Sequence, residues 1–222
     1  SAAAERAAKL INAAIQKNGR ARVIAATGNS QIPLVEALVK QPVDWNTVEF
    51  FHMDEYVGMP PSHPASFRLW IKTRLEDIVH PWKTHYLDGD ASDLQAEIDR
   101  YVRLRLAAPI DLAFVGIGEN GHLAFNHPPV ADFNDPLTVK RVVLDESCLR
   151  QQAGEGHFPD LGSVPREALT ISCSGLFRAD AWVCSVPEIR KAEAVRNALE
   201  GPISEACPGS LLRRHPNTFL YL

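Results

Sequence analysis

The chain has 222 residues, of which 45% are hydrophobic and 23% charged, and its formal net charge is −4. A chain of this length and composition can bury a substantial core as an ordinary globular protein, and its weak negative charge argues against a nucleic-acid partner. The four cysteines form no C-x-x-C pair, and no apolar run approaches the length of a membrane span. We therefore expect a cytoplasmic protein with free thiols and no membrane segment.

Apolar patterning predicts helices that alternate with strands. In chain order, it predicts a helix over residues 3–17, a strand over 22–26, a helix over 33–40, a strand over 48–53 and a helix over 65–78. A capping box at residues 92–95 opens a further helix, and strands follow over 110–115, 137–144, 168–172 and 179–186. The last elements are a helix over 187–200 and a strand over 218–222. This alternation implies one Rossmann-like α/β domain over residues 1–222, with a mainly parallel sheet and helices on both faces.

The first strand-to-helix turn is a candidate phosphate site. It consists of Thr27, Gly28, Asn29 and Ser30. Free N–H groups and the positive end of the helix dipole favour a phosphate at such a turn, and the hydroxyls of Thr and Ser add donors. A simple turn with a helix cap is the alternative interpretation of these four residues.

Two adjacent carboxylates, Asp54 and Glu55, end the second predicted strand. Neighbouring side chains on a strand point to opposite faces, so only one of them can face a given pocket. A carboxylate in this position is well placed to act as a general base, because burial can tune its pKa. The alternative is a solvated acidic turn or a helix cap.

The most distinctive segment is Gly-Ile-Gly-Glu-Asn-Gly-His over residues 116–122, which follows an apolar strand. Its closely spaced glycines allow a sharp turn and a close approach of the backbone to a ligand. His122 is then presented where open α/β sheets bind ligands, and its imidazole exchanges protons near neutral pH. A packed structural histidine is one alternative. A metal site with His52, His127 and Asp54 is another, but no metal-binding spacing supports it, and we expect none.

Two cations are candidates for holding a phosphate. Lys191 is predicted in the second turn of the helix over residues 187–200, from which its side chain leans back toward the sheet. Arg150 carries a guanidinium suited to two parallel hydrogen bonds with a phosphate. Either residue could instead be a surface charge.

Taken together and in this order, these motifs resemble the glucosamine-6-phosphate deaminase and 6-phosphogluconolactonase superfamily over essentially the whole chain. The matching segments are residues 27–30, 53–58, 63–67, 116–128, 191–192, 208–212 and 215–216. Tyr56 and the run of residues 121–126 favour the deaminase branch, since lactonases typically carry Arg in place of Tyr56 and a Gly-His-Thr-Ala-Ser type of run.

The resemblance implies conversion of a 2-amino-2-deoxyhexose 6-phosphate, glucosamine 6-phosphate, to fructose 6-phosphate and ammonia without a metal or organic cofactor. Asp54 would move a proton between C2 and C1 of the opened sugar, and His122 would assist ring opening. The other catalytic residues it implies are Asn120, Glu55 and His127. Around the substrate and its phosphate it implies Thr27, Gly28, Asn29, Ser30, Gly121, Ala124, Arg150 and Lys191. The alternatives are a 6-phosphogluconolactonase, using His122 with water, and a non-catalytic sugar-phosphate-binding protein.

His127 departs from the family pattern, because many deaminases carry Glu at this position. A carboxylate would raise the pKa of His122, whereas a charged imidazole would lower it. The chain also ends soon after residues 215–216, without the longer C-terminal region of hexameric members, so we expect a monomer or homodimer. The preference between gluco and galacto substrates stays open.

Overall fold

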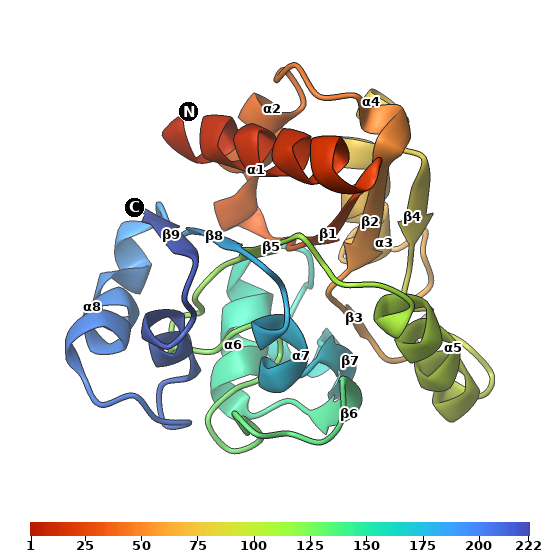
Figure 1. Ribbon diagram of the computed structural model, residues 1–222. Helices are drawn as coiled ribbons and strands as arrows, with labels where there is room; N and C mark the ends of the chain where they lie inside the picture. Colours follow the sequence, from red (N-terminus) through yellow and green to blue (C-terminus); the bar gives the residue numbers. More distant parts are fainter.

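A six-stranded parallel sheet forms the centre of the protein in the computed structural model, which describes residues 1–222 (Figure 1). The strands lie in the order β4–β2–β1–β5–β8–β9. They are β1 (Ala21–Ala25), β2 (Val48–His52), β4 (Lys83–His85), β5 (Leu112–Val115), β8 (Trp182–Ser185) and β9 (Thr218–Tyr221). The predicted α/β fold with a mainly parallel sheet is confirmed. The chain order of the strands reverses between β1 and β5, which creates a crevice at their carboxyl ends.

Helices cover both faces of this sheet, which is why β1, β2, β5 and β8 are buried at every position and lack the alternation of a half-exposed strand. In Figure 1, α1 (Ala2–Asn18) and α2 (Ile32–Leu38) lie in the upper half of the view. Three helices, α5 (Leu94–Leu106), α6 (Glu146–Gly154) and α7 (Cys173–Phe177), lie in the lower half. The first helix ends at Asn18 and is capped by Gly19, whose backbone is left-handed.

Three predicted helices differ in detail from the structure. The helix expected over residues 65–78 is divided into α3 (Phe67–Ile71), a π-helical turn (Lys72–Glu76) and α4 (Asp77–Val79). The cap of α5 is Asp93, whose side chain accepts a hydrogen bond from the N–H of Ala96, so the predicted capping box was one residue too early. The last helix, α8 (Ala192–Glu200), begins later than Pro187, and Lys191 ends the 3₁₀ turn before it.

A second, antiparallel sheet was not predicted. It contains β3 (Asp54–Tyr56), β7 (Glu167–Ile171) and β6 (Val139–Val143), in that order. The strands expected at residues 137–144 and 168–172 therefore pair with each other and not with the parallel sheet. Because β3 follows β2 after a single residue, the small sheet holds the chain rigidly where it leaves the large one.

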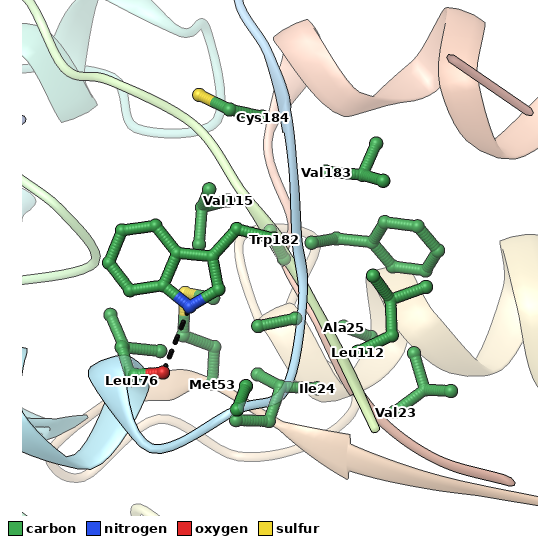
Figure 2. Packing of buried hydrophobic residues seen from close by; sticks show 14 of the residues in the cluster. Val23, Ile24, Ala25, Met53, Leu112, Val115, Leu176, Trp182, Val183 and Cys184 are labelled. Atoms are coloured by element: carbon green, nitrogen blue, oxygen red, sulfur yellow. Dashed lines mark hydrogen bonds between the residues drawn. The ribbon is translucent and has the colours of Figure 1, made fainter. Parts of the chain in front are cut away.

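The hydrophobic core beneath the crevice is centred on Trp182 of β8 (Figure 2). Its ring stacks on that of His215 with centroids 4.7 Å apart, and its indole N–H donates to the carbonyl of Leu176 in α7 at 3.0 Å. Burying an aromatic ring with its one donor satisfied stabilises the platform that carries the site. No helix combines the length and the apolar character that crossing a membrane requires.

Candidate active site

A pocket opens at the carboxyl ends of β1, β5 and β8, at the point where the strand order reverses. Seven of the residues singled out in the sequence line it: Thr27, Gly28, Ser30, Asp54, His122, Ala124 and Lys191. Six others lie outside its wall: Asn29, Glu55, Asn120, Gly121, His127 and Arg150. Four segments that are distant in the sequence thus meet in one pocket, as open α/β sheets allow.

The imidazole of His122 is held in one orientation by Asn120. Nδ1 of His122 lies 2.6 Å from Oδ1 of Asn120, and the same oxygen accepts the backbone N–H of His122 at 3.2 Å. An amide oxygen only accepts, so Nδ1 of a neutral ring carries the proton and Nε2 keeps a free lone pair. Asn120 therefore acts through His122 and does not face the pocket itself.

His122 is neutral near pH 7. Burial lowers its pKa to about 4, with further lowering by Lys191 and His127 against an opposing effect of Asp145. His127 is itself buried behind the pocket, with Nδ1 3.1 Å from the carbonyl oxygen of Phe125. His127 thus lowers the pKa of His122, as expected for an imidazole at this position. It does so electrostatically, because its side chain does not line the pocket.

The glycine-rich run is shaped by close packing. A Cβ at Gly118 would lie 2.0 Å from Cε1 of His122, so the ring can rest on the backbone only at a glycine. Gly121 has a φ of +83°, and a Cβ there would lie 2.8 Å from Sγ of Cys207. Ala124 has a φ of +51°, a left-handed conformation that residues other than glycine rarely adopt and that concentrates at functional sites.

Asp54 and Glu55 point to opposite sides of β3, as the strand geometry predicted. Asp54 faces the pocket, and burial, together with the neighbouring Glu55, raises its pKa to about 8. Glu55 is fully buried on the other side, where it accepts hydrogen bonds from Ser66 Oγ at 2.7 Å and from the N–H of Arg68 at 3.0 Å. Its contacts are those of a carboxylate that fixes the start of α3, and they give it no access to a substrate in the pocket.

The turn after β1 and Lys191 form a further part of the pocket wall. Gly28 has a φ of +94°, which only glycine adopts readily, and it leads into a 3₁₀ turn (Asn29–Gln31) that buries Ser30. Lys191 is only 4% exposed, and its Nζ lies 2.7 Å from Oε2 of Glu188. Arg150 instead points to solvent from α6 and pairs with Glu146, so of the two predicted cations only Lys191 lines the pocket.

Helix α6 and the residue that caps its end supply three pocket residues that the sequence analysis missed, namely Gln151, Gln152 and Glu155. Oε1 of Gln151 accepts the N–H of Glu119 at 3.0 Å, and Oε1 of Gln152 accepts the Tyr56 hydroxyl at 2.6 Å. These bonds join α6 to the glycine-rich run and to β3. The helix has a readable start, because Asp145 caps it by accepting the N–H of Cys148 at 2.8 Å.

The pocket therefore brings together Asp54 and His122, two groups of the kind that can exchange protons, with a cation and a glycine turn suited to a small anion. No three His, Cys, Asp or Glu side chains lie close enough together to hold a metal ion. The fold and the pocket define an α/β protein of the kind that binds a small phosphorylated molecule at a topological switch point.

Comparison with known proteins gives the family. A family profile described as glucosamine-6-phosphate isomerases/6-phosphogluconolactonase matches residues 1–220. The chain is 35% identical to a glucosamine-6-phosphate deaminase of Bacillus thuringiensis over 96% of its own length and 80% of the relative's. It belongs to the glucosamine-6-phosphate isomerase/6-phosphogluconolactonase family, as its motifs predicted.

Solved structures agree with this assignment. A monomeric glucosamine-6-phosphate deaminase superposes with a TM-score of 0.87 at 29% identity, covering 98% of this chain and 90% of that one. A 6-phosphogluconolactonase from Thermotoga maritima superposes with a TM-score of 0.77 at 20% identity, covering 98% of this chain and 91% of that one. The second likeness is one of fold alone.

Proposed function

We propose that the protein converts glucosamine 6-phosphate and water to fructose 6-phosphate and ammonia. The observation that carries this proposal is that Asp54 and His122 face one pocket that Lys191 and the Gly28 turn also line. The relatives of highest similarity reported above are named for this reaction. A phosphate anchored at Lys191 would place the aminosugar carbons beside the two proton-transfer groups.

His122 would open the sugar ring. Its free Nε2 accepts the proton of the anomeric hydroxyl and returns a proton to the ring oxygen as the C1–O5 bond breaks, which gives the open-chain aldehyde. A neutral imidazole is required for the first transfer, and burial keeps the pKa of His122 at about 4. The bond to Asn120 keeps the acceptor nitrogen free throughout.

Asp54 would carry out the isomerisation. Its carboxylate removes the proton from C2 and delivers it to C1, while the amine nitrogen gives up one proton and the C1 oxygen gains one, which converts the aldehyde with a C2 amine to a C2 imine beside a C1 hydroxyl. Water adds to the imine carbon, the C–N bond breaks, and ammonia leaves as the ketone of fructose 6-phosphate forms. The pKa of Asp54 is about 8 in the empty pocket, and the ammonium of a bound aminosugar would lower it toward ionisation.

The test is simultaneous measurement of ammonia and fructose 6-phosphate from glucosamine 6-phosphate, with galactosamine 6-phosphate and 6-phosphogluconolactone as parallel substrates. We expect both products in equal amounts, and their loss in Asp54→Asn. Hydrolysis of the lactone above its spontaneous rate, without ammonia release, would make the protein a lactonase. Thermal stabilisation by the sugar phosphates without any turnover would make it a binding protein.

We further propose that the protein is a monomer or homodimer in the cytoplasm. A solved relative is described as monomeric, and the four cysteines are unpaired, as suits a reducing compartment. Light scattering on the purified chain should give a mass of one or two copies. A larger assembly would contradict the proposal.

A further inference from the structure

Glu155 places a carboxylate at the end of the pocket that the proposed reaction assigns to a phosphate. The residue directly follows α6, and its side chain is 9% exposed. A Cβ built on Gly28 would lie 3.9 Å from Oε2 of Glu155, so the carboxylate stands over the glycine turn. Lys191 lines the same pocket. The candidate phosphate site therefore contains a carboxylate of the protein as well as an ammonium group.

Charged groups from several elements face this carboxylate. Burial raises the pKa of Glu155, and Glu188 raises it further, while Lys191 and Arg190 oppose the rise. Gln151, one turn earlier, lowers it through a side-chain hydrogen bond. The two cations are shared with Glu188, which lies 2.7 Å from each of them. Glu155 is therefore far from fully neutralised by its surroundings.

Two further titratable groups line a pocket together with Glu155. Tyr56 and His157 line a smaller adjoining pocket, to which Glu155 and Gly28 also contribute. The Glu155 charge is one of the groups that raise the pKa of the Tyr56 hydroxyl. Glu155 thus forms part of the wall between the two pockets and can reach a ligand in the larger one.

A phosphate ester is largely a dianion above pH 6, and a carboxylate beside it in a buried pocket would repel it. One proton held between the two groups turns this repulsion into a short charge-assisted hydrogen bond. A sulfate ester is too weak a base to compete for that proton, so it forms a poorer bond with a protonated carboxyl group.

We propose that Glu155 shares one proton with the phosphate of the bound ligand, and that this makes the pocket take up a proton on binding and prefer phosphate to sulfate. The inference rests on the proposed function in one respect, namely that the ligand carries a phosphate. It assigns Glu155 as a specificity-determining residue, distinct from the proton-transfer pair Asp54 and His122.

Titration calorimetry with glucose 6-phosphate and with inorganic phosphate tests the proposal without turnover, because neither carries the amino group that deamination requires. Measured at pH 7.5 in buffers of different ionisation enthalpy, the wild type should take up about one proton more per phosphate than Glu155→Gln. Its affinity should fall by up to about tenfold per pH unit relative to the variant as the pH rises above 7. Asp54 titrates in both proteins, so its contribution cancels in the difference.

Sulfate supplies the second comparison. The wild type should bind inorganic phosphate at least about tenfold more tightly than sulfate at pH 7, and Glu155→Gln should bind the two anions with similar affinity. Glu119→Gln is the matched control, since Glu119 lies 3.0 Å from Arg190 but its side chain is outside the pocket wall. It should keep the proton uptake and the anion preference of the wild type.

Equal proton uptake by the wild type and a folded Glu155 variant would overturn the proposal, as would a failure of the wild type to bind phosphate at millimolar concentration. Glu155→Ala replaces Glu155→Gln if the latter does not fold. A Glu155-dependent proton uptake without deamination of glucosamine 6-phosphate would leave this inference standing and refute the proposed function. Deamination of glucosamine 6-phosphate without a Glu155-dependent proton uptake would support the proposed function and refute this inference.

Discussion

The imidazole of His122 occupies the space that a side chain at Gly118 would need. A Cβ at Gly118 would lie 2.0 Å from Cε1 and 2.2 Å from Nε2 of the ring. The N–H of Gly118 also donates to the carbonyl of His122 at 3.0 Å, so the two residues are tied through the backbone as well. A side chain at Gly118 would therefore either push the ring out of this position or distort the turn that presents it.

Gly118→Ala should accordingly displace the imidazole and lower kcat/KM for glucosamine 6-phosphate by about a hundredfold or more, the range expected when a positioned acid–base group is lost. Steady-state kinetics beside a thermal melt would check this, since the damage should exceed any change in Tm. Gly154→Ala is the control, because a Cβ there meets nothing within 4 Å. Normal turnover in Gly118→Ala would show that the ring position is not critical.

The raised pKa of Asp54 links the stability of the fold to pH. Its pKa is about 8 in the folded protein against an ordinary value of 3.8, so the folded state favours the neutral acid. This contribution to stability is fully present below about pH 4 and is lost as the pH rises through about 8. Asp54→Asn imitates the neutral acid at every pH. Between pH 5 and pH 8, urea unfolding should therefore show the free energy of unfolding of the variant rising relative to that of the wild type by on the order of a few kcal/mol. Parallel pH dependence in the two proteins would contradict the assignment.

The same shift governs the rate. In the free enzyme Asp54 must lose its proton to act as a base, so kcat/KM of the Glu155→Gln variant, which lacks the proton proposed to be shared with the phosphate, should rise with pH until it levels off near pH 8. His122, with a pKa of about 4, is neutral above pH 5 and should cause no further change in the pH profile of kcat/KM there. The profile of kcat should level off at a lower pH, because the ammonium of the bound substrate favours the carboxylate. A kcat/KM profile that is flat from pH 6 to 9 would argue against Asp54 as the base.

Local patterns were sufficient to predict five of the six parallel strands, all but β4, and to single out Asp54 and His122 as pocket residues. The strands β1, β5 and β8 are buried at every position and mostly apolar. Strand alternation alone explains why Asp54 reaches the pocket and Glu55 does not. Each of these predictions depends on residues that are near neighbours in the sequence.

The features that the sequence did not predict depend on packing between residues that are distant in the chain. The three-residue strand β3 becomes a strand only by pairing with β7, more than a hundred positions later. Arg150 has the right chemistry for a phosphate, but α6 is bonded to the site through Gln151 and Gln152, which turns Arg150 to solvent. The same packing brings Glu155 over Gly28, a contact that no motif encodes.

His127→Glu tests how the residue behind the site tunes His122. A carboxylate at this position would raise the pKa of His122, reversing the lowering that His127 now causes. The variant also loses the 3.1 Å contact of Nδ1 with the Phe125 carbonyl, and the buried acceptor left behind should cost about 1–3 kcal/mol of stability. NMR titration of His122 should show the rise in pKa, and His127→Gln should not. An unchanged His122 pKa in His127→Glu would show that the two rings are not coupled, whereas altered deaminase activity would mark His127 as a specificity or activity switch.

Lys191 and Arg150 provide a direct comparison between a buried cation in the pocket and an exposed one outside it. Lys191→Gln removes the one buried ammonium of the pocket while keeping a polar side chain beside Glu188. We expect the KM for glucosamine 6-phosphate to rise by about ten- to a hundredfold, as for the loss of one charge-assisted hydrogen bond worth 1.5–3 kcal/mol, with a smaller change in kcat. Arg150→Ala should leave both constants within about twofold of the wild type, because an exposed i,i+4 pair with Glu146 contributes little. The opposite ranking would require α6 to turn Arg150 inward when the substrate binds, and it would restore the phosphate contact that the family resemblance implied.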